Sequence, residues 1–154
     1  MLEIVEYTEA YAADFKRLNI EWLEKYFVVE TEDVYQLDNP QTSILDKGGS
    51  IFLARYEAKI VGCCALKHEG NSVYELAKMA VTENYQGLGI GRALGQAVIE
   101  KAKAISAQEL YLISNTILLP ARRLYNQLGF VEEPVSSEDQ ARYIRCDLRM
   151  RYPI

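Results

Sequence analysis

The sequence predicts one α/β domain whose central mixed sheet is flanked by helices. Apolar residues alternate with polar ones in some segments, as in strands, and recur at spacings of three and four in others, as in helices. Three strand-like segments follow one another between Ser50 and Val81, which favours an antiparallel meander. The chain has 154 residues, of which 49% are hydrophobic, so we expect one domain over residues 1–154.

The first third of the chain predicts one strand followed by helices. Leu2 and Ile4 alternate with polar residues, and apolar side chains then recur at helical spacing from Glu9 to Tyr26, with Thr8 as the expected N-cap. The segment from Val28 to Lys47 predicts one or two short helices. Its evidence is two cap residues, Thr31 and Asn39, and a stop at Gly48-Gly49.

The middle of the chain predicts three strands and a long helix. The expected strands are Ile51 to Tyr56, Lys59 to Leu66 and Val73 to Val81, joined by short polar turns. A helix begins near Gly89, and its apolar side is expected to carry Leu94, Val98, Ala102 and Ile105.

The last third predicts a strand, a helix and two further strands. Leu110 to Ile113 has the pattern of a buried strand, and Pro120 opens a helix that Gly129 closes. Phe130 to Glu132 and Tyr143 to Arg149 are the last expected strands, separated by a polar loop from Pro134 to Gln140.

Charge and cysteine content exclude several classes of partner. The net charge of −5 and the lack of a basic run argue against nucleic-acid binding. Cys63, Cys64 and Cys146 are expected as reduced core residues, with the adjacent pair on opposite faces of a strand. His68 completes no zinc-ligand spacing with them, so we expect no metal.

The sequence also favours a cytoplasmic protein without a membrane partner. No apolar run approaches the roughly 20 residues that span a bilayer. The first residues, Met1 to Glu6, lack the basic start of a signal peptide.

A glycine-rich segment, Gln86-Gly87-Leu88-Gly89-Ile90-Gly91-Arg92, joins an expected strand to the long helix and predicts a pyrophosphate site. Its glycines allow a tight turn, the helix start supplies free amides, and Arg92 adds a positive charge. A dinucleotide-binding fingerprint fails here, because Arg92 stands where a third small residue is required. A Walker loop also fails, because the chain has no Gly-Lys-Ser or Gly-Lys-Thr.

Together with two neighbouring blocks, the pattern Gln-x-x-Gly-x-Gly resembles the GNAT superfamily of N-acetyltransferases. Glu75 to Thr82 is similar to the family's central strand, and Ala121 to Phe130 to its Ala-x-x-x-Tyr-x-x-x-Gly-Phe segment. The resemblance implies a GNAT fold, a mostly antiparallel sheet with splayed middle strands. It also implies acetyl-CoA as co-substrate, held by these residues: Met79, Ala80, Val81, Gln86, Gly87, Leu88, Gly89, Ile90, Gly91 and Arg92.

The resemblance implies direct transfer of the acetyl group to a primary amine of a small molecule or peptide. Glu75 occupies the position of a catalytic glutamate that would take the proton of the amine. Tyr125 occupies the position of a tyrosine that assists the leaving thiolate, and the Val81 N–H that of the donor to the thioester oxygen. The alternatives are that Glu75 faces solvent or pairs with Lys67 or Lys78, and that Tyr125 is a core residue.

One position departs from the family pattern, because Leu118 stands where many relatives carry asparagine. Asn115 lies nearby, but a turn or cap role is favoured for it, and we assign it no catalytic role.

The acceptor is expected to be selected by the helices before Ser50. Four acidic residues and three aromatic ones predict either a rim that attracts a cationic amine or an ordinary solvated face. They are Glu30, Glu32, Asp33, Asp38, Tyr26, Phe27 and Tyr35.

Two other classes compete with the enzyme. A non-catalytic GNAT-like domain could sense acyl-CoA, although it would need neither Glu75 nor Tyr125. A structural or interaction domain is disfavoured, because glycines at the spacing of Gln86 to Arg92 cost backbone entropy without a ligand. The expected partners are acetyl-CoA and an amine, and a homodimer is compatible with the sequence.

Overall fold

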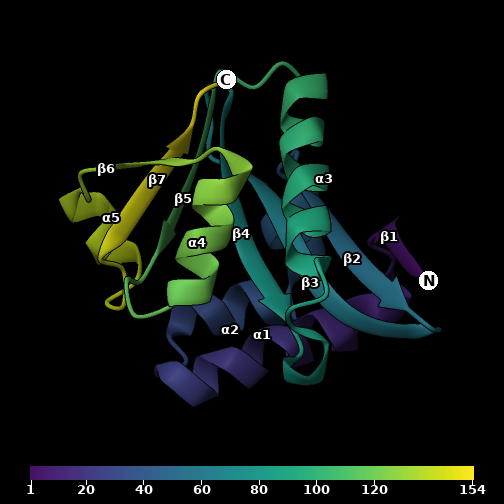
Figure 1. Cartoon of the computed structure of the whole chain (residues 1–154). Helices are drawn as coiled ribbons and strands as arrows, with labels where there is room; N and C mark the ends of the chain where they lie inside the picture. The colour runs from purple at the N-terminus through teal and green to yellow at the C-terminus, as the bar shows by residue number, and fades with distance from the viewer.

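The computed structural model describes residues 1–154 as one seven-stranded sheet with helices on both faces (Figure 1). The strands are β1 (Leu2–Glu6), β2 (Ser50–Tyr56), β3 (Lys59–His68), β4 (Val73–Val81), β5 (Glu109–Ser114), β6 (Val131–Glu133) and β7 (Leu148–Tyr152). The helices are α1 (Ala12–Tyr26), α2 (Thr31–Asp38), α3 (Ile90–Ala104), α4 (Leu119–Leu128) and α5 (Ser137–Arg142). The strand order is β1-β2-β3-β4-β5-β7-β6, and β4 with β5 is the one parallel pair. The predicted mixed, mostly antiparallel sheet is confirmed.

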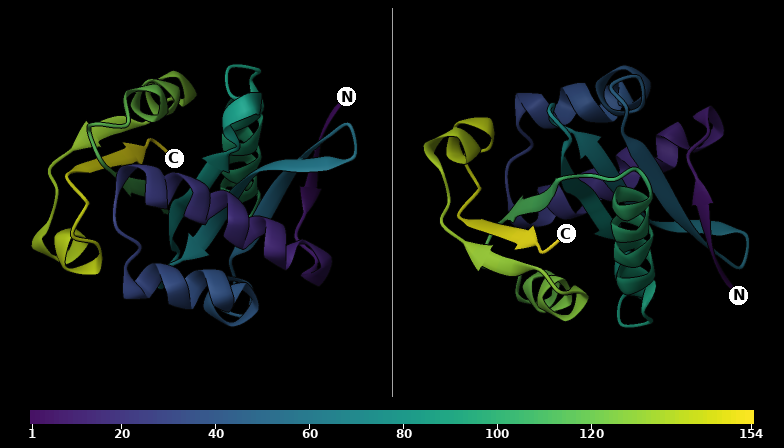
Figure 2. Two further views of the ribbon diagram at one scale, coloured as in Figure 1. Left: turned by 90° about the horizontal axis from the view of Figure 1, so that it is seen from below. Right: turned by 90° about the horizontal axis from the view of Figure 1, so that it is seen from above.

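The sheet separates two hydrophobic cores. Helices α1 and α2 lie on one face, and α3 and α4 lie on the other (Figure 2). Adjacent cysteines of β3 show the alternation: Cys63 packs into the core beneath α1, and Cys64 into the core beneath α3. This confirms that the two thiols point to opposite faces, and both are fully buried.

The first helices begin differently from the prediction. A 3-10 turn at Glu9–Tyr11 precedes α1, and the Thr8 side chain caps neither element. The N-cap of α2 is Glu30 rather than Thr31, because Glu30 and Asp33 exchange side-chain bonds with each other's backbone amides in a capping box. A π-helical turn follows at Gln41–Leu45, with Pro40 as its N-cap.

The prediction for the C-terminal region is wrong in two respects. Residues 137–140, expected in a polar loop, belong to α5 (Ser137–Arg142), because Ser136 and Asp139 build a second capping box. The last strand is Leu148–Tyr152, not Tyr143 to Arg149, because a turn closed by a hydrogen bond from the Cys146 amide to the Tyr143 carbonyl precedes it. Ile105, predicted on the buried side of α3, follows its last turn and is 37% exposed.

No helix has the length and apolar character that crossing a membrane would require.

Candidate functional site

The two central strands separate after a short parallel contact. β4 pairs with β5 only through Val73, Tyr74 and Glu75, whereas β5 pairs with β7 along its other edge as far as Ser114. The rest of β4 therefore leaves one backbone edge unpaired. A cavity of about 530 Å³ lies there, bounded by β4, the start of α3, the end of β5, α4 and α1. Its volume is typical of small-molecule sites.

A β-bulge shapes the wall that β4 gives to this cavity. Cys63 pairs with Ala80 and Ala65 with Ala77, so Lys78 and Met79 together oppose Cys64 alone. Lys78 adopts a φ of 56°, a left-handed conformation that is rare for a lysine. The Cys63 thiol donates to the Lys78 carbonyl at 3.2 Å. Bulges redirect side chains, and this one places Lys78 at the cavity.

The glycine-rich loop closes the other end of the cavity. Gly87 and Gly89 have φ values of 80° and 82°, and a Cβ at either would have no neighbour within 4 Å. These glycines are therefore required by backbone conformation rather than by packing. Gly89 is the N-cap of α3 and has no side chain to satisfy the first amides of the helix.

The loop is held against the end of β4 and opens toward the cavity. The Gln86 side chain donates to the Val81 carbonyl at 3.0 Å. Of the ten residues predicted to hold the co-substrate, Met79, Ala80, Val81, Gln86, Gly87, Gly89, Ile90, Gly91 and Arg92 line the cavity. Leu88 does not line it and is 57% exposed. An open strand edge leading to an uncapped helix start fits a ligand with an extended arm and a phosphate end.

Tyr125 reaches the same cavity from α4. Its side chain packs in the core beneath α3, with its ring 6.2 Å from that of Phe130, so the predicted core role is also real. Burial raises the pKa of Tyr125, and the neighbouring Cys64 thiol adds to this. The phenol therefore stays protonated throughout the neutral range.

Glu75 also lines the cavity but is held in ion pairs. Arg142 Nη2 donates to Glu75 Oε1 at 2.8 Å, and Lys67 Nζ lies 3.6 Å from the same oxygen. Burial alone would raise the pKa of Glu75, but the charges of Lys67 and Arg142 outweigh it and hold the pKa below its ordinary value. The alternative in which Glu75 pairs with Lys67 is therefore confirmed. The carboxylate stays ionised at neutral pH and is a weaker base than a free one.

A second ionic cluster stands behind the bulge and was missed by the sequence analysis. Arg145 forks onto Asp33 with two hydrogen bonds of 2.7 Å and reaches Glu30 at 3.1 Å. Lys78 Nζ lies 3.3 Å from Asp33 Oδ1 and 3.4 Å from the Tyr143 hydroxyl. Burial lowers the pKa of Lys78, and the positive charges of Lys67 and Arg145 lower it further. The negative charge of Asp33 acts the other way but does not restore the ordinary pKa. No sequence signal pointed to Arg145, because its position depends on the turn after α5.

The predicted acidic rim is wrong. None of Glu30, Glu32, Asp33 and Asp38 lines the cavity. Asp33 is fully buried beneath Arg145 and Lys78, and Asp38 pairs with Lys16 at 2.6 Å. Glu30 pairs with Arg145, and none of the four carboxylates provides an acidic surface at the cavity.

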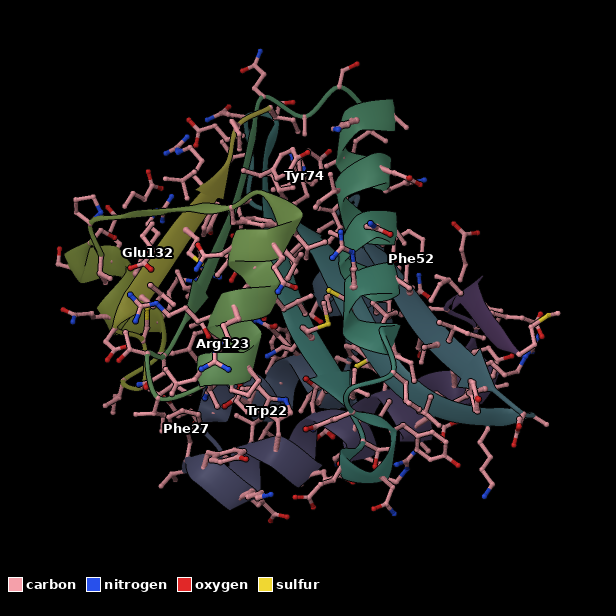
Figure 3. The ribbon with its side chains drawn as sticks, in the orientation of Figure 1. Trp22, Phe27, Phe52, Tyr74, Arg123 and Glu132 are labelled. Atoms are coloured by element: carbon pink, nitrogen blue, oxygen red, sulfur yellow. The ribbon has the colours of Figure 1, made fainter.

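The aromatic part of that prediction is partly met. Tyr26 and Phe27 line the cavity, whereas Tyr35 does not. Trp22 joins them in the cavity lining, with its ring 5.9 Å from that of Phe27 (both labelled in Figure 3).

The departure at Leu118 leaves no amide there, and Asn115 takes a structural role. Asn115 donates to the Arg145 carbonyl at 2.7 Å and accepts from the Ile117 amide at 2.9 Å. This is the turn role that the sequence favoured. Both Asn115 and Leu118 line the cavity.

Comparison with known protein families identifies the family of this chain. The model of the acetyltransferase (GNAT) family matches residues 12–130, and the chain therefore belongs to that family. An N-acetylaspartate synthetase from Xenopus tropicalis is 35% identical over 94 residues. That match covers 60% of this chain and 35% of the relative, so the chain spans about a third of the length of this curated relative.

Solved structures share the fold at lower identity. An acetyltransferase of the GNAT family from Staphylococcus aureus Mu50 has a TM-score of 0.89 and 23% identity, with 99% of this chain and 98% of the other covered. The PaiA N-acetyltransferase from Thermoplasma acidophilum, solved in complex with coenzyme A, has a TM-score of 0.77 and 15% identity. Coverage there is 99% of this chain and 98% of the other.

Proposed function

We propose that this chain is an acetyl-CoA-dependent N-acetyltransferase that moves the acetyl group directly to a primary amine of a small molecule or peptide. The observation that carries the proposal is the continuity of one cavity. It runs from the uncapped start of α3, along the unpaired edge of β4, to the side chains of Glu75 and Tyr125.

In this proposal the loop at the start of α3 and the edge of β4 together bind coenzyme A. The amides at the start of α3 and the Arg92 guanidinium would bind the pyrophosphate of coenzyme A. Backbone groups of Met79, Ala80 and Val81 would pair with its extended arm, as an added strand does. Family membership and the coenzyme A complex of a structural neighbour support these assignments.

Replacing Gly89 by aspartate should weaken acetyl-CoA binding by more than tenfold, because it puts a negative charge beside the phosphates. The positive φ of Gly89 strains any side chain placed there, but the space around it is open, so the fold should persist with lower stability. Gly70→Asp is the matched control, because Gly70 also has a positive φ and open space but lies outside the cavity. Calorimetry measures both affinities. Equal affinity in wild type and a folded Gly89→Asp protein would show that the phosphates do not bind beside Gly89.

We propose catalytic roles for three groups that line the inner part of the cavity. Acetyl-CoA would supply the acetyl group as an activated thioester. A free alkylamine has a pKa of about 10.4, so most of it arrives protonated. We propose that Glu75 removes this proton from the amine, directly or through a water molecule. The Val81 N–H would donate to the thioester oxygen, and the Tyr125 hydroxyl to the departing sulfur.

Replacing Tyr125 by phenylalanine should lower kcat with little change in the Kd for acetyl-CoA, because a bond made late in the reaction is lost. Tyr152→Phe is the control. Tyr152 packs against the same core, with its ring centre 5.4 Å from that of Phe130, but it does not line the cavity. Steady-state rates and calorimetry separate the two effects. An unchanged kcat would reduce Tyr125 to a packing residue.

Amino acids are the first acceptors to test, since the relative from Xenopus tropicalis is named an N-acetylaspartate synthetase. A panel of amines is incubated with acetyl-CoA, and free thiol release is measured. Release that depends on one amine supports the enzyme. Tight binding of acetyl-CoA without release for any amine would instead support the acyl-CoA sensor.

A further inference from the structure

The charged residues that line the acceptor end of the cavity are mostly cations, whereas the carboxylates that pair with Lys78 and Arg145, Asp33 and Glu30, do not line it. Glu75 is the one carboxylate among the residues that line the cavity, and it is already bound by Arg142 and Lys67. The cations that line it are Lys78, Arg92 and Arg145. Arg92 stands at the start of α3, at the phosphate end, whereas Lys78 and Arg145 come from the bulge of β4 and the turn after α5. The acceptor end therefore presents two cations with no uncommitted carboxylate.

These cations are fixed in place but keep donors to spare. The side chains of Lys78 and Arg145 are 6% and 14% exposed. Asp33 holds both of them, and the Arg145 guanidinium lies 4.4 Å from the centre of the Tyr143 ring. The contacts of Arg145 with Asp33 and Glu30 use only part of its N–H groups. Lys78 likewise has a third N–H beyond those directed to Asp33 and Tyr143.

A third donor in the same wall lacks a partner. The Trp22 indole N–H is buried and has no hydrogen-bond acceptor, although Trp22 lines the cavity. Its ring centre lies 5.8 Å from the Arg145 guanidinium. A buried donor without an acceptor is costly, and a ligand oxygen would relieve that cost.

We infer that the acceptor amine carries a carboxylate, which binds between Lys78 and Arg145 at the bulge of β4. This inference rests on the proposed function and names its substrate class. Two fixed cations and a free indole donor suit a group that only accepts hydrogen bonds, and a carboxylate is such a group. A polyamine or another acceptor with additional positive charge is disfavoured, because the one carboxylate that lines the cavity, Glu75, is already bound by Lys67 and Arg142.

The first experiment compares acids with their amides on the unaltered protein. L-alanine is tested against L-alaninamide, and L-aspartate against L-asparagine, with KM expressed for the free-base amine. We expect KM to be lower for the acid by about tenfold or more in at least one pair, the size expected of a hydrogen-bonded charge pair. Equal KM values in both pairs, or a preference for the amides, would overturn the inference while leaving the acetyltransferase activity intact.

A variant then assigns the effect to the site. Lys78→Met should raise KM for the preferred acid by at least about tenfold and bring the acid-to-amide ratio of KM toward one. Lys78→Arg should restore part of the preference. Lys59→Met is the control, because Lys59 is exposed at the first residue of β3 and does not line the cavity. An acid-to-amide ratio that survives Lys78→Met would overturn the assignment to this residue.

Arg145→Lys is a second variant for the case in which Lys78→Met does not fold. It keeps a cation beside Asp33 but loses the planar fork, and we expect the same narrowing of the acid-to-amide ratio.

An equilibrium measurement separates the two levels of the proposal. The protein is saturated with coenzyme A and titrated by calorimetry with N-acetyl-L-alanine and N-acetyl-L-alaninamide, and with N-acetyl-L-aspartate and N-acetyl-L-asparagine. Preferential binding of an acid without turnover of any amine would keep the carboxylate site and reject the enzyme. Turnover of amines with no preference for any acid would keep the enzyme and reject the carboxylate site.

Discussion

Replacing Glu75 by glutamine should lower kcat/KM by about 10² to 10⁴ near neutral pH, if Glu75 is the only group that takes the proton of the amine. The deficit should shrink as the pH rises, because the amine then arrives deprotonated and needs no base. The ion pairs with Arg142 and Lys67 lower the pKa of Glu75, so its own titration should not appear between pH 6 and 8. The measurement is the ratio of wild-type to variant kcat/KM from neutral pH to the pKa of the amine.

Glu69→Gln is the matched control for this prediction. Glu69 lies in the same ionic cluster, 3.4 Å from both Lys67 and Arg142, but it does not line the cavity. If disturbing the cluster were enough to stop the reaction, Glu69→Gln would reproduce the loss. A constant ratio across the pH range for Glu75→Gln would instead assign Glu75 to orienting Arg142 or the substrate.

Replacing Asp33 by asparagine should lower the free energy of unfolding by about 3–5 kcal/mol at pH 7, because two buried cations lose their shared carboxylate. Arg145 and Lys78 both depend on it, and its side chain is fully buried. Urea denaturation at pH 7 measures the loss. Asp38→Asn on the same helix is the control: its pair with Lys16 is exposed, and such pairs contribute only about 0–1 kcal/mol.

Asp33 should also make the stability of the wild-type protein depend on pH in the acidic range. Burial alone would raise the pKa of Asp33, but the hydrogen bonds from Arg145 and the charge of Lys78 lower it below the ordinary 3.8. A lowered carboxyl pKa means that the stabilisation is present above the unfolded pKa and is lost as the pH falls through the native one. The free energy of unfolding of the wild-type protein should therefore fall below about pH 4 as Asp33 becomes protonated. The Asp33→Asn protein should not show this part of the decrease. Parallel curves for the two proteins would show that Asp33 is not the group responsible.

Much of the fold could be predicted because its elements carry local signals. The strands β2 and β3 are short, mostly apolar runs separated by a polar turn, and β4 begins and ends at the predicted residues. Gly129, in a left-handed conformation with φ 111°, ends α4 as expected of a glycine after a helix. The C-terminal prediction was wrong because Tyr143 and Cys146 carry an apolar pattern that suits a buried turn as well as a strand.

The glycine-rich loop was predictable for the same reason, since a phosphate site at a helix start depends on contiguous residues. The sequence determined the meander, the loop at the start of α3 and the positions that resemble catalytic residues. Only the tertiary structure decided the charge of the acceptor end. Asp33, Lys78 and Arg145 lie far apart in the chain, and their meeting requires α2, the bulge of β4 and the turn after α5 together. Pairing across such distances depends on how the elements pack, and no local pattern of residues records it.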